Sequence, residues 1–219
     1  MPISPPTRAL LTWLPATILI VVIGLVVLAT FAVEGSWWAE ENPAASADQK
    51  ASDGASMLTD AGFDYVNVEG IVRARIGEGA LPAEELGMGA DTEKAAEFRR
   101  PVRAIIAGGE DVYVVDDIAA LTAVTATGEL ASVTLAFDAA GTWTDAVNRV
   151  RSLAPTFGWD VAQIDGLEGE LADFNRDGTG DAFTAVIGPS EGGARVTATL
   201  FFDRGSGTTP VTLTFEPAA

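Results

Sequence analysis

The sequence predicts an α+β protein, in which a single N-terminal transmembrane helix precedes an antiparallel β-sheet domain packed by one main amphipathic helix. Three observations lead to this prediction. An uncharged apolar run fills residues 9–33, several later segments alternate apolar and polar residues with a period of two, and residues 143–153 place apolar side chains at helical spacing.

The N-terminal run is long enough to cross a membrane. It holds 25 residues without a charge, and a helix of that length spans about 37 Å, against roughly 30 Å of hydrocarbon. Trp13 near one end, and Trp37 and Trp38 beyond the other, fit the aromatic belts at membrane interfaces. A signal peptide has an apolar core of only about 7 to 15 residues and a small-residue cleavage pattern. We therefore expect residues 9–33 to remain as an uncleaved anchor.

The few positive charges near the anchor predict its orientation. Arg8 and the amino terminus lie on one side, whereas no Lys or Arg follows on the other side until Lys50. By the positive-inside tendency, residues 1–8 stay in the cytoplasm. The chain is then a single-pass protein of the cell membrane, with the rest of its length extracytoplasmic.

The part beyond the anchor is strongly acidic. It carries all 31 Asp and Glu residues and 12 of the 13 Lys and Arg residues, because only Arg8 precedes Glu34, and 12 minus 31 gives a net charge of −19. Such a charge repels phosphate, so nucleic acid is a poor partner, and an acidic surface also keeps a domain soluble. We expect the membrane, through the helix, and a protein or an envelope polymer as partners.

The composition excludes most common catalytic chemistry. The chain has no Cys, which excludes disulfides and cysteine nucleophiles, and no His, which removes the usual general base and zinc ligand. We therefore predict no enzymatic activity. A hydrolase that works with carboxylates alone, paired across a cleft, is the remaining enzymatic alternative.

Two regions follow the anchor. Residues 34–56 are mostly small and polar and predict a flexible tether. Residues 57–219 then form one acidic α+β domain, long enough for a single core.

Period-two alternation predicts the strands of this domain. In the first of them, Val72, Ala74 and Ile76 share a face opposite Arg73 and Arg75. Further strands are predicted at 132–137 (SVTLAF), 195–202 (RVTATLFF) and 211–215 (VTLTF). Hairpin turns are predicted about Gly108 and Gly109, and about Thr127 and Gly128.

The main helix is predicted from Thr142 to about Ala154. Thr142 suits the N-cap and Asp145 the third helical position, as in a capping box, while Pro155 disfavours the helical conformation at Ala154. The apolar stripe of this helix is expected to cover the sheet. Two short segments, 54–62 and 91–98, are weaker helix predictions.

The stretch DFNRDGTGD leaves two interpretations open. Asp173, Asn175 and Asp177 match positions 1, 3 and 5 of a calcium loop, and Asp181 matches position 9, so the first half resembles the loops of EF-hand and dockerin proteins. The second half departs from them, because Thr184 stands where a bidentate carboxylate belongs. Asn, Asp and Gly are also typical of a tight turn.

We favour a turn between two strands, GELADF (169–174) and DAFTAVI (181–187). A calcium site at Asp173, Asn175, Asp177 and Asp181 remains the alternative, and calcium is the one cofactor that the sequence suggests. In that case the domain would be a calcium-dependent adhesion or structural module.

Two other patterns lack the context that catalysis needs. GPSEG (188–192) matches the serine-hydrolase pattern around Ser190, but a strand follows it and the chain has no His, so we predict a hairpin turn. Asp116 and Asp117 are adjacent and are expected to end a strand. The sequence therefore favours a membrane-anchored cell-envelope protein whose extracytoplasmic domain binds or scaffolds.

Overall fold

A computed structural model describes residues 54–138, 141–177, 179–190 and 192–218. These residues belong to one compact unit, Ala45–Ala219. The predicted cytoplasmic segment 1–8, the predicted transmembrane helix 9–33 and most of the predicted tether lie outside the described residues. Within the described ranges, no helix combines the length and the apolar character needed to cross a membrane.

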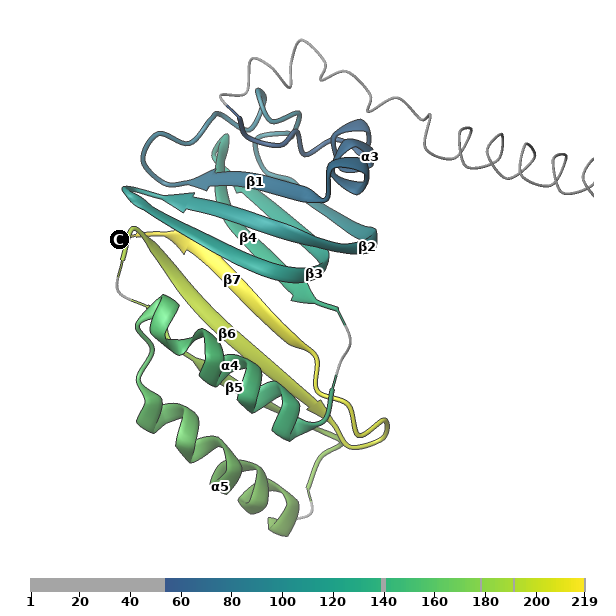
Figure 1. Cartoon of the computed structure of the whole chain (residues 1–219), viewed down its shortest axis with the longest axis vertical. Helices are drawn as coiled ribbons and strands as arrows, with labels where there is room; N and C mark the ends of the chain where they lie inside the picture. Colours follow the sequence, from purple (N-terminus) through teal and green to yellow (C-terminus); the bar gives the residue numbers. More distant parts are fainter. Residues whose placement is uncertain (1–53, 139–140, 178, 191, 219) are drawn as a thin grey trace, which may run out of the picture. The chain divides into compact units, whose positions relative to one another are not determined.

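The described residues form an α+β fold with three helices and a seven-stranded mixed sheet (Figure 1). In chain order the elements are α3 (Asp60–Glu69), β1 (Ile71–Ile76), β2 (Glu93–Gly108), β3 (Asp111–Ala126), β4 (Glu129–Phe137), α4 (Trp143–Phe157), α5 (Val161–Asp177), β5 (Ala182–Ile187), β6 (Ala194–Asp203) and β7 (Val211–Pro217). The strand order across the sheet is β1-β2-β3-β4-β7-β6-β5.

The sheet is mixed rather than purely antiparallel, which corrects the prediction. β1 and β2 are parallel, whereas every other neighbouring pair is antiparallel. The reason is the long connection, residues 77–92, between these two strands. A connection of a dozen or more residues lets the chain return to the start of the first strand before it pairs, as parallel pairing requires.

Two predicted elements have the wrong type. Residues 91–98, predicted as a short helix, contain the start of β2, where Glu93–Glu97 pair with β3. Residues 169–174, predicted as a strand, lie inside α5. Helix α3 begins at Asp60, later than the predicted segment 54–62. The described residues thus contain three helices: α4 matches the predicted main helix, α3 overlaps the weaker prediction at 54–62, and α5 was not predicted.

The main helix, α4, begins as predicted. Thr142 is its N-cap, and Thr142 and Asp145 form a complete capping box. The hydroxyl and backbone N–H of Thr142 donate to Oδ2 of Asp145 at 2.8 and 2.9 Å, and these bonds hold the pKa of Asp145 below its ordinary value. The helix passes Pro155 and ends at Phe157, three residues later than predicted, where Gly158 adopts the left-handed conformation that stops it.

The replacement Thr142→Ala is expected to lower the free energy of unfolding by about 1 kcal/mol, because the backbone N–H of Asp145 then loses its acceptor. Urea unfolding at pH 7 measures the change. Thr156→Ala is the matched control, since Thr156 is exposed in the last turn of the same helix. An equal loss of stability in the two variants would contradict the capping role.

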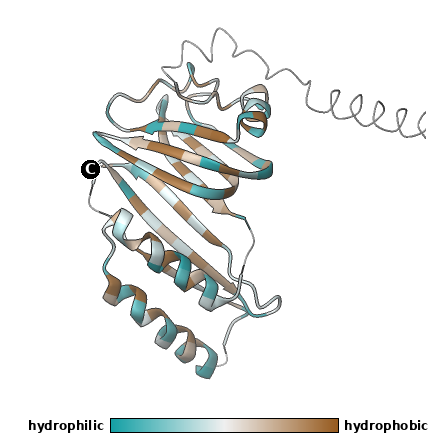
Figure 2. Cartoon of the chain, in the orientation of Figure 1, coloured by the Kyte–Doolittle hydropathy of each residue, from teal (hydrophilic) through white to brown (hydrophobic). Residues whose placement is uncertain are grey.

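The two faces of the sheet differ. On the inner face, side chains from all seven strands join one core with residues of α3, α4 and α5. On the outer face, several large apolar side chains are exposed, among them Val112, Val114, Val186 and Phe201. Figure 2 shows the resulting alternation of apolar and polar bands along the strands. Threonines occupy much of the outer face between these apolar positions, and Thr134 and Thr214 hydrogen bond across β4 and β7 at 3.1 Å.

The turn between β2 and β3 contacts the start of β6, although β4 and β7 lie between them in the strand order. The backbone N–H of Gly193 donates to Oδ2 of Asp111 at 2.8 Å. A Cβ atom on Gly193 would overlap the carbonyl group of Gly108. The sheet is therefore curled, and two glycines, Gly108 and Gly193, permit backbone to meet backbone where this turn contacts β6.

The two edges of the sheet have different hydrogen-bond partners. At the β1 edge, the backbone N–H of Ser56 donates to the carbonyl of Arg73 at 2.8 Å. At the β5 edge, the side chain of Gln163 on α5 donates to the carbonyl of Val186 and accepts from the N–H of Gly188, both at 3.3 Å. The amide of Gln163 thus takes the place of a neighbouring strand at that end of β5.

Candidate functional site

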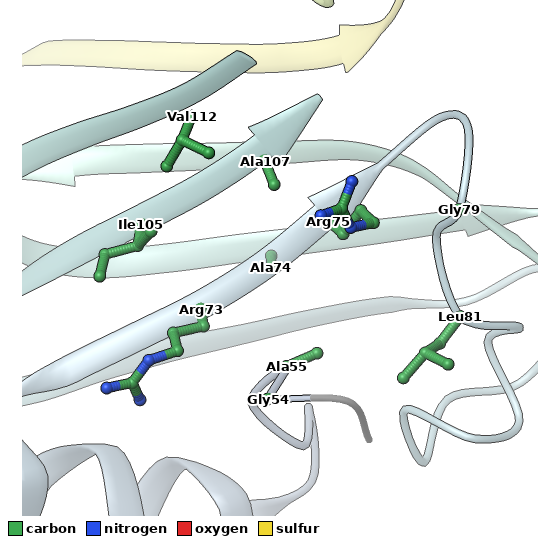
Figure 3. Close-up of a pocket in the computed structure, with 10 residues that line it drawn as sticks. All are labelled: Gly54, Ala55, Arg73, Ala74, Arg75, Gly79, Leu81, Ile105, Ala107 and Val112. Carbon is green, nitrogen blue, oxygen red and sulfur yellow. The ribbon is translucent and has the colours of Figure 1, made fainter. Parts of the chain in front are cut away.

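A groove of about 210 Å³ lies on the outer face of the sheet, beside the β1 edge (Figure 3). Its floor consists of apolar side chains of β2 and β3. The floor residues are Ile105, Ala107 and Val112. Its rim is formed by Gly54 and Ala55 on one side and by Gly79 and Leu81 in the β1–β2 connection on the other. With β1, five separate stretches of chain build the groove.

Strand β1 contributes the charged residues of this groove. The predicted alternation is confirmed: Val72, Ala74 and Ile76 are buried, whereas Arg73 and Arg75 point to the outer face. Because side chains two positions apart share a face of a strand, both arginines line the groove. Arg73 is half-buried and Arg75 is exposed, and the two side chains have different hydrogen-bond partners.

Arg73 is neutralised by a neighbouring carboxylate. Its Nη2 atom lies 2.8 Å from Oε1 of Glu69, the last residue of α3. The hydrogen bond to Glu69 raises the pKa of Arg73 above its ordinary value. Its backbone is also engaged, because its N–H donates to Oγ of Ser56 at 2.9 Å. Arg73 therefore fixes the N-terminal segment of the domain against β1 and presents little free charge.

Arg75 is held in place without being neutralised. Its Nη1 atom donates to the carbonyl oxygen of Gly109 at 3.2 Å, across the turn between β2 and β3. No carboxylate of the described residues forms an ion pair with it, whereas nearby Arg103 pairs with Asp116 at 2.6 Å. A guanidinium carries five N–H donors. Arg75 thus keeps a positive charge and spare donors at the groove of a strongly acidic domain.

A second cavity, of about 180 Å³, adjoins the groove on the other side of Gly54 and Ala55. Arg73 lines both cavities, and the second also contains Glu69 and Tyr65. Since its two charged residues already pair with each other, this second cavity offers no free charge to a ligand. The groove beside Arg75 is the better binding site.

The predicted calcium residues lie mostly on a helix. Asp173, Asn175 and Asp177 belong to the last turns of α5, and Asp181 follows just before β5. Asp173 pairs with Arg176 at 2.9 Å. An α-helix advances by about 100° per residue, so Asn175 lies on a different side from Asp173 and Asp177.

These residues are therefore not part of a turn between two strands. Within the described ranges, no group of three or more His, Cys, Asp or Glu side chains is placed to hold a metal ion. Calcium binding at Asp173, Asn175, Asp177 and Asp181 stays a prediction, and no observation of the described residues adds to it.

The other two patterns have structural roles. Ser190 is buried, and its hydroxyl donates to the carbonyl of Ala194 at 3.2 Å and accepts from the N–H of Val196 at 2.9 Å. Asp116 and Asp117 lie within β3 and do not end it, which corrects the prediction. Asp117 has a φ of 63°, at the irregular point where the pairing of β3 with its neighbours shifts.

The groove itself was not predicted from the sequence. The alternation in IVRARIG indicated that Arg73 and Arg75 face outward, and that was the only available signal. The rim and the floor come from segments up to 58 positions apart, from Gly54 to Val112. No local pattern identifies such an assembly.

Three comparisons with known proteins found no match. No protein-family model matches the sequence, and neither a curated protein nor a solved structure shows significant similarity to it.

Proposed function

We propose that this chain is a single-pass, membrane-anchored protein of the cell envelope, whose extracytoplasmic domain binds another macromolecule and catalyses no reaction. The observation that carries the proposal is the groove on the outer face of the sheet. That face exposes large apolar side chains, and exposed apolar surface next to specific polar groups is typical of interaction sites.

The chemistry of the groove supports binding more than catalysis. Its described lining consists of apolar residues, glycines and two arginines, with no carboxylate among them. Hydrolysis by carboxylates alone requires two of them about 5 to 9.5 Å apart across a cleft. Arginine and an apolar floor suit recognition of a partner, since arginine is enriched at protein interfaces.

Site-specific photo-crosslinking tests the proposal in cells that produce the full-length chain. A photoreactive amino acid at Val112, which is 61% exposed on the outer face, is expected to yield a crosslinked product of one discrete mass. The matched control is the same replacement at Val161, which is 51% exposed on α5. Val161 is expected to yield no such product.

The comparison of the two positions decides the outcome. The same set of products from both positions would indicate collisions without a specific surface and would contradict the proposal. The absence of any product from position 112 would contradict it as well.

A further inference from the structure

Next to the groove, the β1 edge has backbone groups that no other described residue pairs with. Ser56 pairs with the backbone of Arg73 through two hydrogen bonds, of 2.8 and 2.9 Å. Backbone groups alternate between the two sides of a strand with a period of two, so the N–H and C=O of Arg75 point to the same side as those of Arg73. Among the described residues, no partner at this edge satisfies these two groups of Arg75.

The side chain of Arg75 adds a charge to this position. Its guanidinium is exposed and makes one hydrogen bond, to Gly109, among the described residues. Arg100 is comparable, since it donates to the carbonyl of Val68 at 2.9 Å and has no ion pair in the described ranges. Arg100 does not line the groove, however, and lies in the middle of β2.

The apolar floor of the groove lies on the opposite side of β1 from its free edge. Ile105 and Ala107 of β2 and Val112 of β3 lie beside Arg75 on the outer face (Figure 3). A strand added at the free edge of β1 therefore meets the edge backbone and Arg75, and a ligand that fits both has an extended backbone and a carboxylate. A short acidic polypeptide segment combines them, because alternate side chains of an added strand point toward the same face.

We propose that the groove binds an extended acidic segment of a partner protein, which pairs with the backbone of Arg75 as an added edge strand and places a carboxylate against its guanidinium. Arginine and a carboxylate form charge-assisted, often bidentate hydrogen bonds. The proposal rests on the binding function proposed above and specifies its ligand. The net charge of −19 beyond the anchor repels acidic chains from the domain as a whole, so binding of such a segment depends on the local attraction to Arg75.

Peptide binding to the full-length chain in detergent micelles tests the proposal. The probe is a fluorescent, terminally blocked heptapeptide of alternating valine and threonine with a central glutamate, and its binding is followed by fluorescence anisotropy. Two matched peptides carry glutamine in place of the glutamate, or N-methyl groups at the backbone positions that an edge strand would use. Both peptides are expected to bind with an affinity at least about tenfold lower than that of the glutamate peptide.

Two arginine variants locate the binding site. Arg75→Gln is expected to weaken binding of the glutamate peptide about tenfold or more, because a charge-assisted hydrogen bond is lost. Arg100→Gln removes the same charge from the domain and is expected to change the affinity by less than about twofold. Thermal melting of both variants shows whether the fold is retained, and Arg75→Lys is expected to restore part of the affinity.

Several results would overturn the proposal. The first is no binding of the glutamate peptide, and the second is equal binding to the wild type and Arg75→Gln. The third is binding that N-methylation of the peptide leaves unchanged, because this would indicate that the site contacts an anion without pairing with a strand. Competition by inorganic phosphate as effective as that by the unlabelled peptide would have the same meaning. If the peptide binds only to a variant that carries Asp48→Asn and Asp53→Asn, the chain's own N-terminal segment is the occupant of the groove instead.

The photo-crosslinking experiment separates this proposal from the more general one. If position 112 crosslinks to a partner while the glutamate peptide does not bind, the domain is a binding module and the acidic ligand is wrong. If neither experiment gives a signal, both proposals fail.

Discussion

Replacing Gly193 by alanine is expected to lower the free energy of unfolding by about 3 kcal/mol or more. A Cβ atom at this position would overlap the carbonyl carbon and oxygen of Gly108, which are backbone atoms and cannot move aside as a flexible side chain does. Relief requires the turn between β2 and β3 to separate from β6. That movement also breaks the hydrogen bond from Gly193 to Asp111.

Urea unfolding of residues 45–219, followed by the fluorescence of the buried Trp143 and Trp159, measures this effect. The matched control is Gly169→Ala in α5, where nothing lies within 4 Å of the added Cβ. This control is expected to stabilise the domain by about 0.5 to 1 kcal/mol, because alanine favours a helix over glycine. A Gly193→Ala variant as stable as the wild type would show that the turn between β2 and β3 does not contact Gly193 in solution.

The replacement Phe215→Ala is expected to cost about 3 to 5 kcal/mol. Phe215 is fully buried on β7, and its ring centroid lies 5.8 Å from that of Tyr113 and 5.9 Å from that of Phe157. These three rings connect β7, β3 and α4, so a cavity at Phe215 weakens contacts among three elements. The partners come from distant segments and cannot easily collapse into the space.

The same substitution on the outer face provides the comparison. Phe201→Ala removes an equal side chain from β6, but Phe201 is 44% exposed, and the expected loss is less than about 1 kcal/mol. Unfolding in urea under identical conditions measures both variants. Similar losses at the two positions would mean that the outer face is covered in solution, contrary to the binding surface proposed here.

Sequence reasoning succeeded where the signal was local and periodic. The alternation at Val72, Ala74 and Ile76 predicted which face of β1 is buried, and the capping box at Thr142 and Asp145 predicted the start of α4. In these segments the side chains that contact the core follow the period of the element itself.

It failed where contacts distant in the sequence overrule local preference. Residues 91–98 are rich in Ala, Glu and Lys, which favour a helix, but pairing with β3 makes them a strand. In α5, the turn-forming residues near Asp177 concealed the helical spacing of Ile164, Leu167 and Leu171, which contact the core. The candidate site has the same difficulty, because it depends on how five segments meet.

The unequal edges of the sheet bear on the stoichiometry of any complex. Strand addition between copies of one chain can continue into a filament only if both edges of the sheet are open, because each new subunit must offer an edge to the next. Here the side chain of Gln163 already binds Val186 on β5 and Gly188 just after it, while the backbone of Arg75 on β1 has no edge partner among the described residues. Under the binding proposed above, one strand added at β1 gives a one-to-one complex, and the Gln163 side chain disfavours strand addition at the C-terminal end of β5.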